Sequence, residues 1–124
     1  MITNEDNMEL MKRYEDNHFD LAIVDPPYGI DADNKNNGKG NLNFNEVVEK
    51  GWDSEIPSAE YFNELKRVSK NQIIWGGNYF LDNLGNTRCF FIWDKKQPHD
   101  FSLAMAEMAW TSFDKLAKIF RMRV

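Results

Sequence analysis

The sequence predicts an α/β fold with a mostly parallel sheet and an antiparallel edge from its last strands. Short apolar runs alternate with helix-like segments along the first part of the chain, and this alternation is typical of parallel strands joined by helices. The run at 21–24 is apolar throughout, as in a strand covered on both faces. The later apolar runs follow one another more directly, which favours an antiparallel edge.

The first elements follow from spacing and composition. Residues 8–14 place apolar side chains at helical spacing, and Asn4 or Asp6 is positioned to cap that short helix. Residues 21–24 form the first predicted strand. Residues 31–50 are rich in Asn, Gly and Lys and predict a long mobile loop. Loops of this length are usually functional or disordered, so this loop either closes over a site or is a disordered insertion.

The clearest helical pattern of the chain lies at 56–70. Ser58 is a preferred N-cap residue, and the segment carries one apolar stripe at helical spacing. The residues of that stripe are Tyr61, Phe62, Leu65 and Val68.

The second half of the chain predicts mainly strands. Residues 71–77 form a short apolar strand that ends on two glycines, and residues 78–84 suit a short helix. A third strand is predicted at 88–95. Residues 104–113 begin with helical spacing and end as a strand, and residues 117–124 predict the last strand.

Composition limits the function classes. The 124 residues carry 15 Lys and Arg against 20 Asp and Glu, a net charge of -5. This is the wrong sign for coating nucleic acid, so any nucleic-acid contact must be local. The single cysteine, Cys89, excludes an internal disulfide, and no apolar run reaches membrane-spanning length. We therefore expect a soluble cytoplasmic protein without membrane contact, forming one domain or part of one.

A chemically informative motif, Asp25-Pro26-Pro27-Tyr28, directly follows the first predicted strand. Ligands of open α/β sheets bind beyond the carboxyl ends of the strands, so its position suits a binding site. The two prolines fix φ and remove backbone donors, and Pro26 biases Asp25 toward an extended backbone. The result is a stiff segment that offers hydrogen-bond acceptors beside the flat ring of Tyr28.

Such a segment can activate an aromatic amine. The amino group of adenine is a poor nucleophile because its lone pair is delocalised into the ring. The Asp25 carboxylate and a proline carbonyl could accept both N–H groups, and Tyr28 could stack on the base for about 1–3 kcal/mol. The base must be flipped out or already single-stranded. The alternative reading is a Pro-Pro turn that merely ends a strand.

The tetrapeptide resembles motif IV of the DNA amino-methyltransferases, which modify adenine N6 or cytosine N4; Asp in the first position is more usual in adenine enzymes. The segments 4–30, 67–80 and 89–95 resemble the permuted, phage- and prophage-type enzymes. The resemblance implies a Rossmann-like methyltransferase sheet, S-adenosylmethionine as cofactor, no metal, and DNA with a flipped adenine as partner. The same chemistry on RNA or another planar amide remains open.

Individual residues inherit roles from this resemblance. The motif at 25–28 matches the catalytic motif at every position. Asp6 falls where the family places an acidic residue that contacts S-adenosylmethionine, and a helix cap explains it equally well. Trp75 and Gly76 lie at the end of the second strand, near the expected cofactor pocket, although core packing is the commoner fate of tryptophan.

The sequence departs from the family in one respect: no Gly-rich turn of the Phe-x-Gly-x-Gly kind follows the catalytic motif. The resemblance therefore implies that residues 1–124 are the N-terminal part of a catalytic domain, truncated at the C-terminus, with a partial sheet. The alternative is a catalytically inactive remnant or a partner-dependent binding module of a split methyltransferase. Missing neighbours would leave the strand at 21–24 an exposed apolar edge, which predicts self-association or a complementing subunit.

Other reactive residues favour ordinary roles. Cys89 lies in a predicted strand, where core packing is far more common than nucleophilic attack. His18 and His99 lack metal-ligand spacing. Lys95 and Lys96 follow the third strand, where they could meet phosphate or solvent. The basic concentration near the end is equally open between DNA backbone contact and a charged strand face; it comprises Lys115, Lys118, Arg121 and Arg123.

Overall fold

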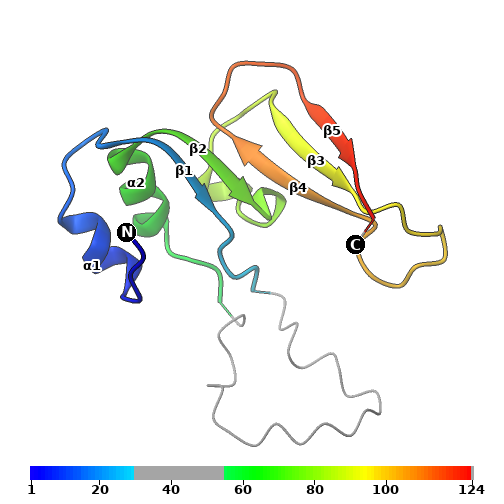
Figure 1. The fold of residues 1–124 in the computed structure, drawn as a ribbon, viewed down its shortest axis with the longest axis horizontal. Helices are drawn as coiled ribbons and strands as arrows, with labels where there is room; N and C mark the ends of the chain where they lie inside the picture. Colours follow the sequence, from blue (N-terminus) through cyan, green and yellow to red (C-terminus); the bar gives the residue numbers. More distant parts are fainter. Residues whose placement is uncertain (30–54, 124) are drawn as a thin grey trace, which may run out of the picture.

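The computed structural model describes residues 1–29 and 55–123 as a mixed α/β fold with a five-stranded sheet (Figure 1). The loop predicted at 31–50 lies outside the described residues. The elements in chain order are α1 (Asn7–Lys12), β1 (Phe19–Val24), α2 (Ala59–Val68), β2 (Ser69–Trp75), the 3-10 turns η2 (Gly77–Tyr79) and η3 (Leu81–Asn83), β3 (Phe90–Asp94), β4 (Ala106–Thr111) and β5 (Lys118–Arg121).

The sheet order is β1-β2-β4-β3-β5. β1 pairs in parallel with β2, and β3 with β5, while β4 is antiparallel to both β2 and β3. Four strands therefore point the same way and β4 alone is reversed. The predicted antiparallel edge is wrong in its position, because β4 returns after β3 and inserts between β3 and β2. That insertion sets Trp110 opposite both Ile74 and Phe90.

The core lies between α2 and one face of the sheet. The stripe predicted for this helix is buried, and the Ser58 hydroxyl accepts a hydrogen bond from the Tyr61 backbone N–H, as expected of an N-cap. Phe62 is fully buried against a core that includes Ile74 and Phe80. The segment at 78–84, predicted as one helix, forms two 3-10 turns instead, and the residues from Ala106 are strand from their start.

A single arginine fixes α1 against α2. The Arg67 guanidinium donates to the backbone oxygens of Met11 and Tyr14, and it pairs with the carboxylates of Asp16 and Glu64. Arg67 lies on α2, whereas three of these partners lie on α1 or the turn after it. The N-terminal helix is therefore held by a local polar network in addition to apolar packing.

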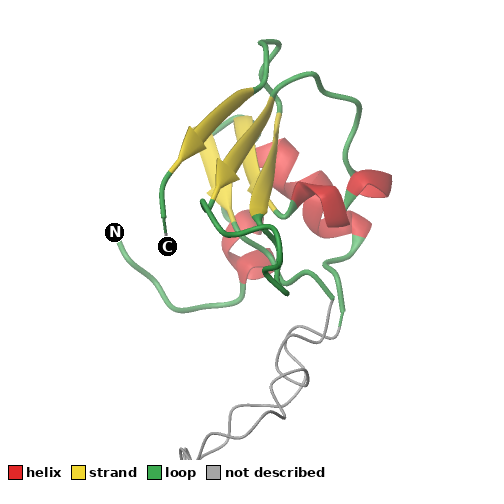
Figure 2. Cartoon of the chain, turned by 90° about the vertical axis from the view of Figure 1, so that its right-hand side faces the viewer, coloured by secondary structure: helices red, strands yellow, loops and turns green. Residues whose placement is uncertain are grey.

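The other face of the sheet carries no helix among the described residues, as Figure 2 shows. Ala22 and Val24 of β1 pack against the core, and the alternate residues Leu21 and Ile23 are 42% and 61% exposed. The prediction of a strand covered on both faces is therefore wrong. β1 is an edge strand, because β2 is its only partner in the described structure. The sequence predicted such an exposed edge for this strand.

Segments of membrane-spanning character are absent from the part of the chain that the structure describes. None of the helices within residues 1–29 and 55–123 is long and apolar enough to cross a membrane. This agrees with the lack of a long apolar run in the sequence.

Candidate functional site

The carboxyl ends of β1, β2 and β3 meet at one edge of the sheet, because these strands point the same way. A cavity of about 210 Å³ opens there. Its lining includes Tyr28 from the segment after β1, Gly76, Asn78 and Tyr79 from the turn after β2, Lys95 after β3, and Glu107 near the start of β4. The four elements thus bring together residues that lie far apart in the sequence, where ligands of open sheets usually bind.

Of the motif at 25–28, Tyr28 lines this cavity, and Asp25 is joined to it by a hydrogen bond. Asp25 is exposed at the tip of β1, Pro26 is buried, and Tyr28 is half-buried. The Tyr28 hydroxyl donates a hydrogen bond to Asp25 Oδ1 with an O–O distance of 2.5 Å. The second oxygen of Asp25 has no hydrogen bond to a described residue. One carboxylate oxygen is thus oriented by the tyrosine, and the other keeps its capacity to accept a hydrogen bond.

Two tyrosine rings form one wall of the cavity. The rings of Tyr28 and Tyr79 are stacked, with centroids 4.9 Å apart and an interplanar angle of 17°. Tyr28 also lies against Gly76, whose φ is +67° and where an added Cβ would come within 2.1 Å of the tyrosine ring. Only glycine combines that backbone conformation with such close contact. Gly76 therefore serves as the floor beneath the Tyr28 ring.

The electrostatics keep Tyr28 protonated. Partial burial raises the pKa of its hydroxyl well above the ordinary value, and the hydrogen bond to the Asp25 carboxylate raises it further. At neutral pH the tyrosine is thus a hydrogen-bond donor to Asp25.

An ion pair between Lys95 and Glu107 closes the opposite wall. Their side chains are 17% and 32% exposed, and the Lys95 ammonium also lies 5.5 Å from the centre of the Trp93 ring. The sequence singled out Lys95 for its place after a strand. It gave no sign of Glu107, because no local pattern reveals that β4 inserts beside β2. Asn78 and Tyr79 were missed because they lie on a 3-10 turn where the sequence predicted a helix.

Two residues that the resemblance assigned to the cofactor do not line this cavity. Asp6 is the N-cap of α1, where its carboxylate accepts hydrogen bonds from the backbone N–H groups of Met8 and Glu9. Trp75 is the last residue of β2, and its ring meets that of Phe120 edge-on with centroids 6.2 Å apart. Neither lines the cavity, whereas Tyr28 and Gly76 do.

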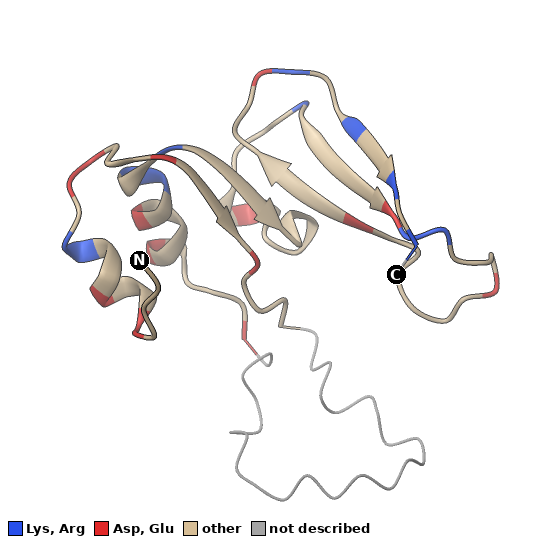
Figure 3. Cartoon of the chain, in the orientation of Figure 1, with Lys and Arg blue, Asp and Glu red and all other residues tan. Residues whose placement is uncertain are grey.

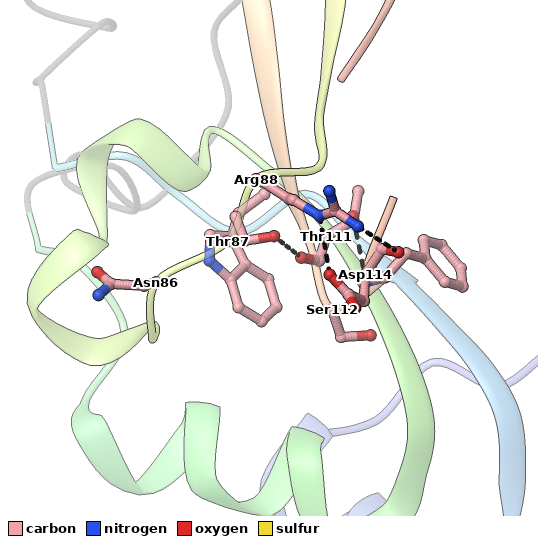
Figure 4. A pocket seen from close by; sticks show the side chains of 8 residues that line it. Asn86, Thr87, Arg88, Thr111, Ser112 and Asp114 are labelled. Carbon is pink, nitrogen blue, oxygen red and sulfur yellow. Dashed lines mark hydrogen bonds and ion pairs between the residues drawn. The ribbon is translucent and has the colours of Figure 1, made fainter. Parts of the chain in front are cut away.

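A larger, more open hollow of about 600 Å³ lies at the other end of the strands (Figure 4). Arg88 and Asp114 pair across it at 2.9 Å, and the Thr87 hydroxyl donates to the Thr111 carbonyl oxygen. The Ser112 hydroxyl donates to Asn71 and accepts from the Gln72 backbone N–H. These groups tie the start of β3 and the end of β4 to their neighbours, so this hollow offers a ligand few uncommitted polar groups.

The remaining candidates from the sequence have structural surroundings. Cys89 is buried, and its thiol lies 3.7 Å from the Leu116 carbonyl oxygen. The basic side chains at 115, 118, 121 and 123 are exposed, two of them in β5 (Figure 3), and Arg121 pairs with Asp94. Within residues 1–29 and 55–123, no group of three potential metal ligands occurs.

No known protein family, curated protein or solved structure matches this chain. The site combines an Asp25 oxygen that can still accept a hydrogen bond, a proline segment without backbone donors, the stacked Tyr28 and Tyr79 rings, and the Lys95–Glu107 ion pair. Together they suit a flat, amine-bearing ligand.

Proposed function

We propose that the cavity beside residues 25–28 binds a flipped adenine, and that the chain belongs to an S-adenosylmethionine-dependent DNA adenine-N6 methyltransferase with a partial Rossmann-like sheet in the cytoplasm. The observation that carries the proposal is the Asp25 carboxylate, which accepts a hydrogen bond from the cavity-lining Tyr28 and keeps a second oxygen without one from a described residue. Had Asp25 and Tyr28 been packed inward with no cavity beside them, base binding would be excluded.

The proposed activation of the adenine amino group depends on two hydrogen-bond acceptors. Tyr28 donates to one Asp25 oxygen and thereby orients the carboxylate, leaving the other oxygen to accept an N–H of the adenine amino group. In this proposal the backbone carbonyl of Pro26 is the second acceptor. With both N–H groups bound, the nitrogen becomes more pyramidal and its lone pair more available. Neither a metal nor a covalent enzyme–base bond is needed.

The described residues do not fit the cofactor. Its ordinary cradle is an open Gly-rich turn, but the open face of Gly76 is covered by the Tyr28 ring. The cavity of about 210 Å³ also lies below the range of about 300–1,000 Å³ typical of sites for larger ligands. The cavity thus has room for one base but not for S-adenosylmethionine.

The direct test is methyl transfer to single-stranded DNA, measured as N6-methyladenine by mass spectrometry. We expect Asp25→Ala to form no product under conditions in which the wild-type chain forms it, with unchanged circular dichroism, because Asp25 is exposed and its loss spares the core. Undiminished turnover by Asp25→Ala would refute its role. No turnover by the wild type, with no calorimetric binding of S-adenosylmethionine, would favour the second function below.

The second candidate is a partner-dependent binding module, which the exposed edge of β1 favours. We take the occupant to be a second copy of the chain. A two-fold axis at Leu21 would pair two β1 strands antiparallel, with Phe19 opposite the partner's Ile23. All these side chains then share one face, so the pairing extends an apolar ladder across both copies and satisfies both free edges.

This pairing makes a distinct prediction. Leu21→Lys would set two ammonium groups opposite each other, so we expect a wild-type dimer and a monomeric variant in light scattering at micromolar concentration. The matched control is Leu116→Lys, which also replaces an exposed leucine (69%) but lies before β5 and should leave the dimer intact. A strictly monomeric wild type would contradict the pairing.

A further inference from the structure

The turn after β2 is fixed from two sides. Gly76 needs its left-handed conformation beneath the Tyr28 ring, and an added Cβ on Gly77 would come within 2.4 Å of Trp110 Cβ and 2.8 Å of its backbone nitrogen. The Gly76 N–H donates to the Met108 carbonyl, and the Tyr79 N–H donates to the Gly76 carbonyl. Two adjacent glycines cost chain entropy on folding, so this turn is held in place at some expense of stability.

Two side chains of the turn are only partly buried and face the cavity. Gly77 and Phe80 are buried, whereas Asn78 is half-buried, Tyr79 is exposed, and both line the cavity. The Asn78 amide makes no hydrogen bond to a described residue. In contrast, no buried side-chain polar atom of the described structure lacks a partner. The amide is therefore an uncommitted donor and acceptor at the rim of the proposed base site.

The tyrosine pair limits where a base can stack. A base inserted between Tyr28 and Tyr79 would need ring centres about 7 Å apart, twice a contact distance of about 3.5 Å. The observed separation is 4.9 Å. The base must therefore lie outside the pair, in the cavity whose lining includes Asn78.

We propose that Asn78 is a specificity-determining residue whose amide N–H₂ donates to the ring nitrogen next to the adenine amino group. The proposal deepens the function above and rests on it for the identity of the base. Asp25 and the Pro26 carbonyl take the amino hydrogens, so the neighbouring ring nitrogen, an acceptor, is left for a donor. Asn78 supplies one, as asparagine does when it reads adenine edges. Bases that carry N–H at that ring position would then be rejected.

The test is the affinity of the full 124-residue chain for 2′-deoxyadenosine, measured by NMR titration without cofactor. We expect Asn78→Ala to weaken binding about threefold to tenfold, the loss of one hydrogen bond. Asn78→Asp should weaken it further, because its carboxylate would face the lone pair of the ring nitrogen. The matched control is Asn86→Ala, in the hollow at the other end of the sheet, which should bind as the wild type does.

Ligand analogues locate the contact. Either 1-deaza- or 7-deaza-2′-deoxyadenosine should bind the wild type more weakly than the parent nucleoside and bind Asn78→Ala equally well, because the same hydrogen bond is already absent. The proposal is overturned if Asn78→Ala binds like the wild type, if neither analogue loses affinity, or if deoxyadenosine does not bind at millimolar concentration. Asn78-dependent binding without methyl transfer would refute the proposed activity and leave this inference standing.

Discussion

Replacing Gly76 by alanine tests the close packing that shapes the cavity wall. At φ +67° an alanine is strained by about 1–2 kcal/mol. Its Cβ would also lie 2.1, 2.5 and 2.8 Å from three atoms of the Tyr28 ring, so the ring must move, and overpacking of this kind costs about 1–3 kcal/mol. We therefore expect Gly76→Ala to lower the free energy of unfolding by about 2–5 kcal/mol.

The two contributions can be separated in a double-mutant cycle. With Tyr28→Ala already present, the clash is gone and only the backbone strain remains, so the further change Gly76→Ala should cost about 1–2 kcal/mol. The assay is urea unfolding followed by far-ultraviolet circular dichroism. Gly85→Ala is the matched control, since no atom lies within 4 Å of an added Cβ there, and it should change stability little.

The reasoning would be refuted by either of two results. One is a cost for Gly76→Ala below about 1 kcal/mol, the lower limit of the backbone strain alone. The other is a cost that is the same with and without Tyr28, which would mean that the ring does not lie over the glycine. Comparable losses for Gly85→Ala and Gly76→Ala would also contradict the local explanation.

Two further predictions concern Arg67 and the titration of Tyr28. Arg67→Met should lower the free energy of unfolding by about 2–4 kcal/mol, because it leaves several backbone and carboxylate acceptors without their donor. Arg88→Met removes an exposed ion pair and should cost at most about 1 kcal/mol in the same urea assay. Equal losses for the two variants would contradict the role of Arg67 in holding α1 against α2. Because the pKa of Tyr28 is higher in the folded state than the ordinary value of about 10, its contribution to stability is full below that pH and is lost as the pH rises above it. Tyr28→Phe should therefore lose stability less steeply than the wild type between neutral and alkaline pH, and parallel curves would refute the shift.

Local signals in the sequence were sufficient for α2 and for the motif at the tip of β1. The α2 segment combines a cap at Ser58 with an apolar stripe, and both depend only on residues within a few positions of each other. The order in which the strands pair could not be predicted from such local signals. The insertion of β4 between β2 and β3 depends on Trp110 meeting Ile74 and Phe90, and no local period encodes that choice.

The difference between local signals and long-range strand pairing also explains the errors around the site. A continuous apolar run such as that of β1 is typical of burial on both faces, but it does not tell a core strand from one whose outer face is exposed, and Ile23 is exposed. Glu107 escaped prediction because it reaches the cavity only through sheet topology, and Asn78 and Tyr79 because they lie on a 3-10 turn where the sequence predicted a helix. The positions of Asp25 and Tyr28 at the tip of β1 were predictable because they depend on one strand end and one stiff tetrapeptide.

The most direct test is a crystal structure of the chain soaked with 2′-deoxyadenosine. We expect the base in the cavity lined by Tyr28 and Tyr79, with its amino nitrogen about 2.7–3.2 Å from an Asp25 carboxylate oxygen. A nucleoside bound instead in the hollow beside Arg88 and Asp114, or one in the cavity with its amino group turned away from Asp25, would contradict the proposed site.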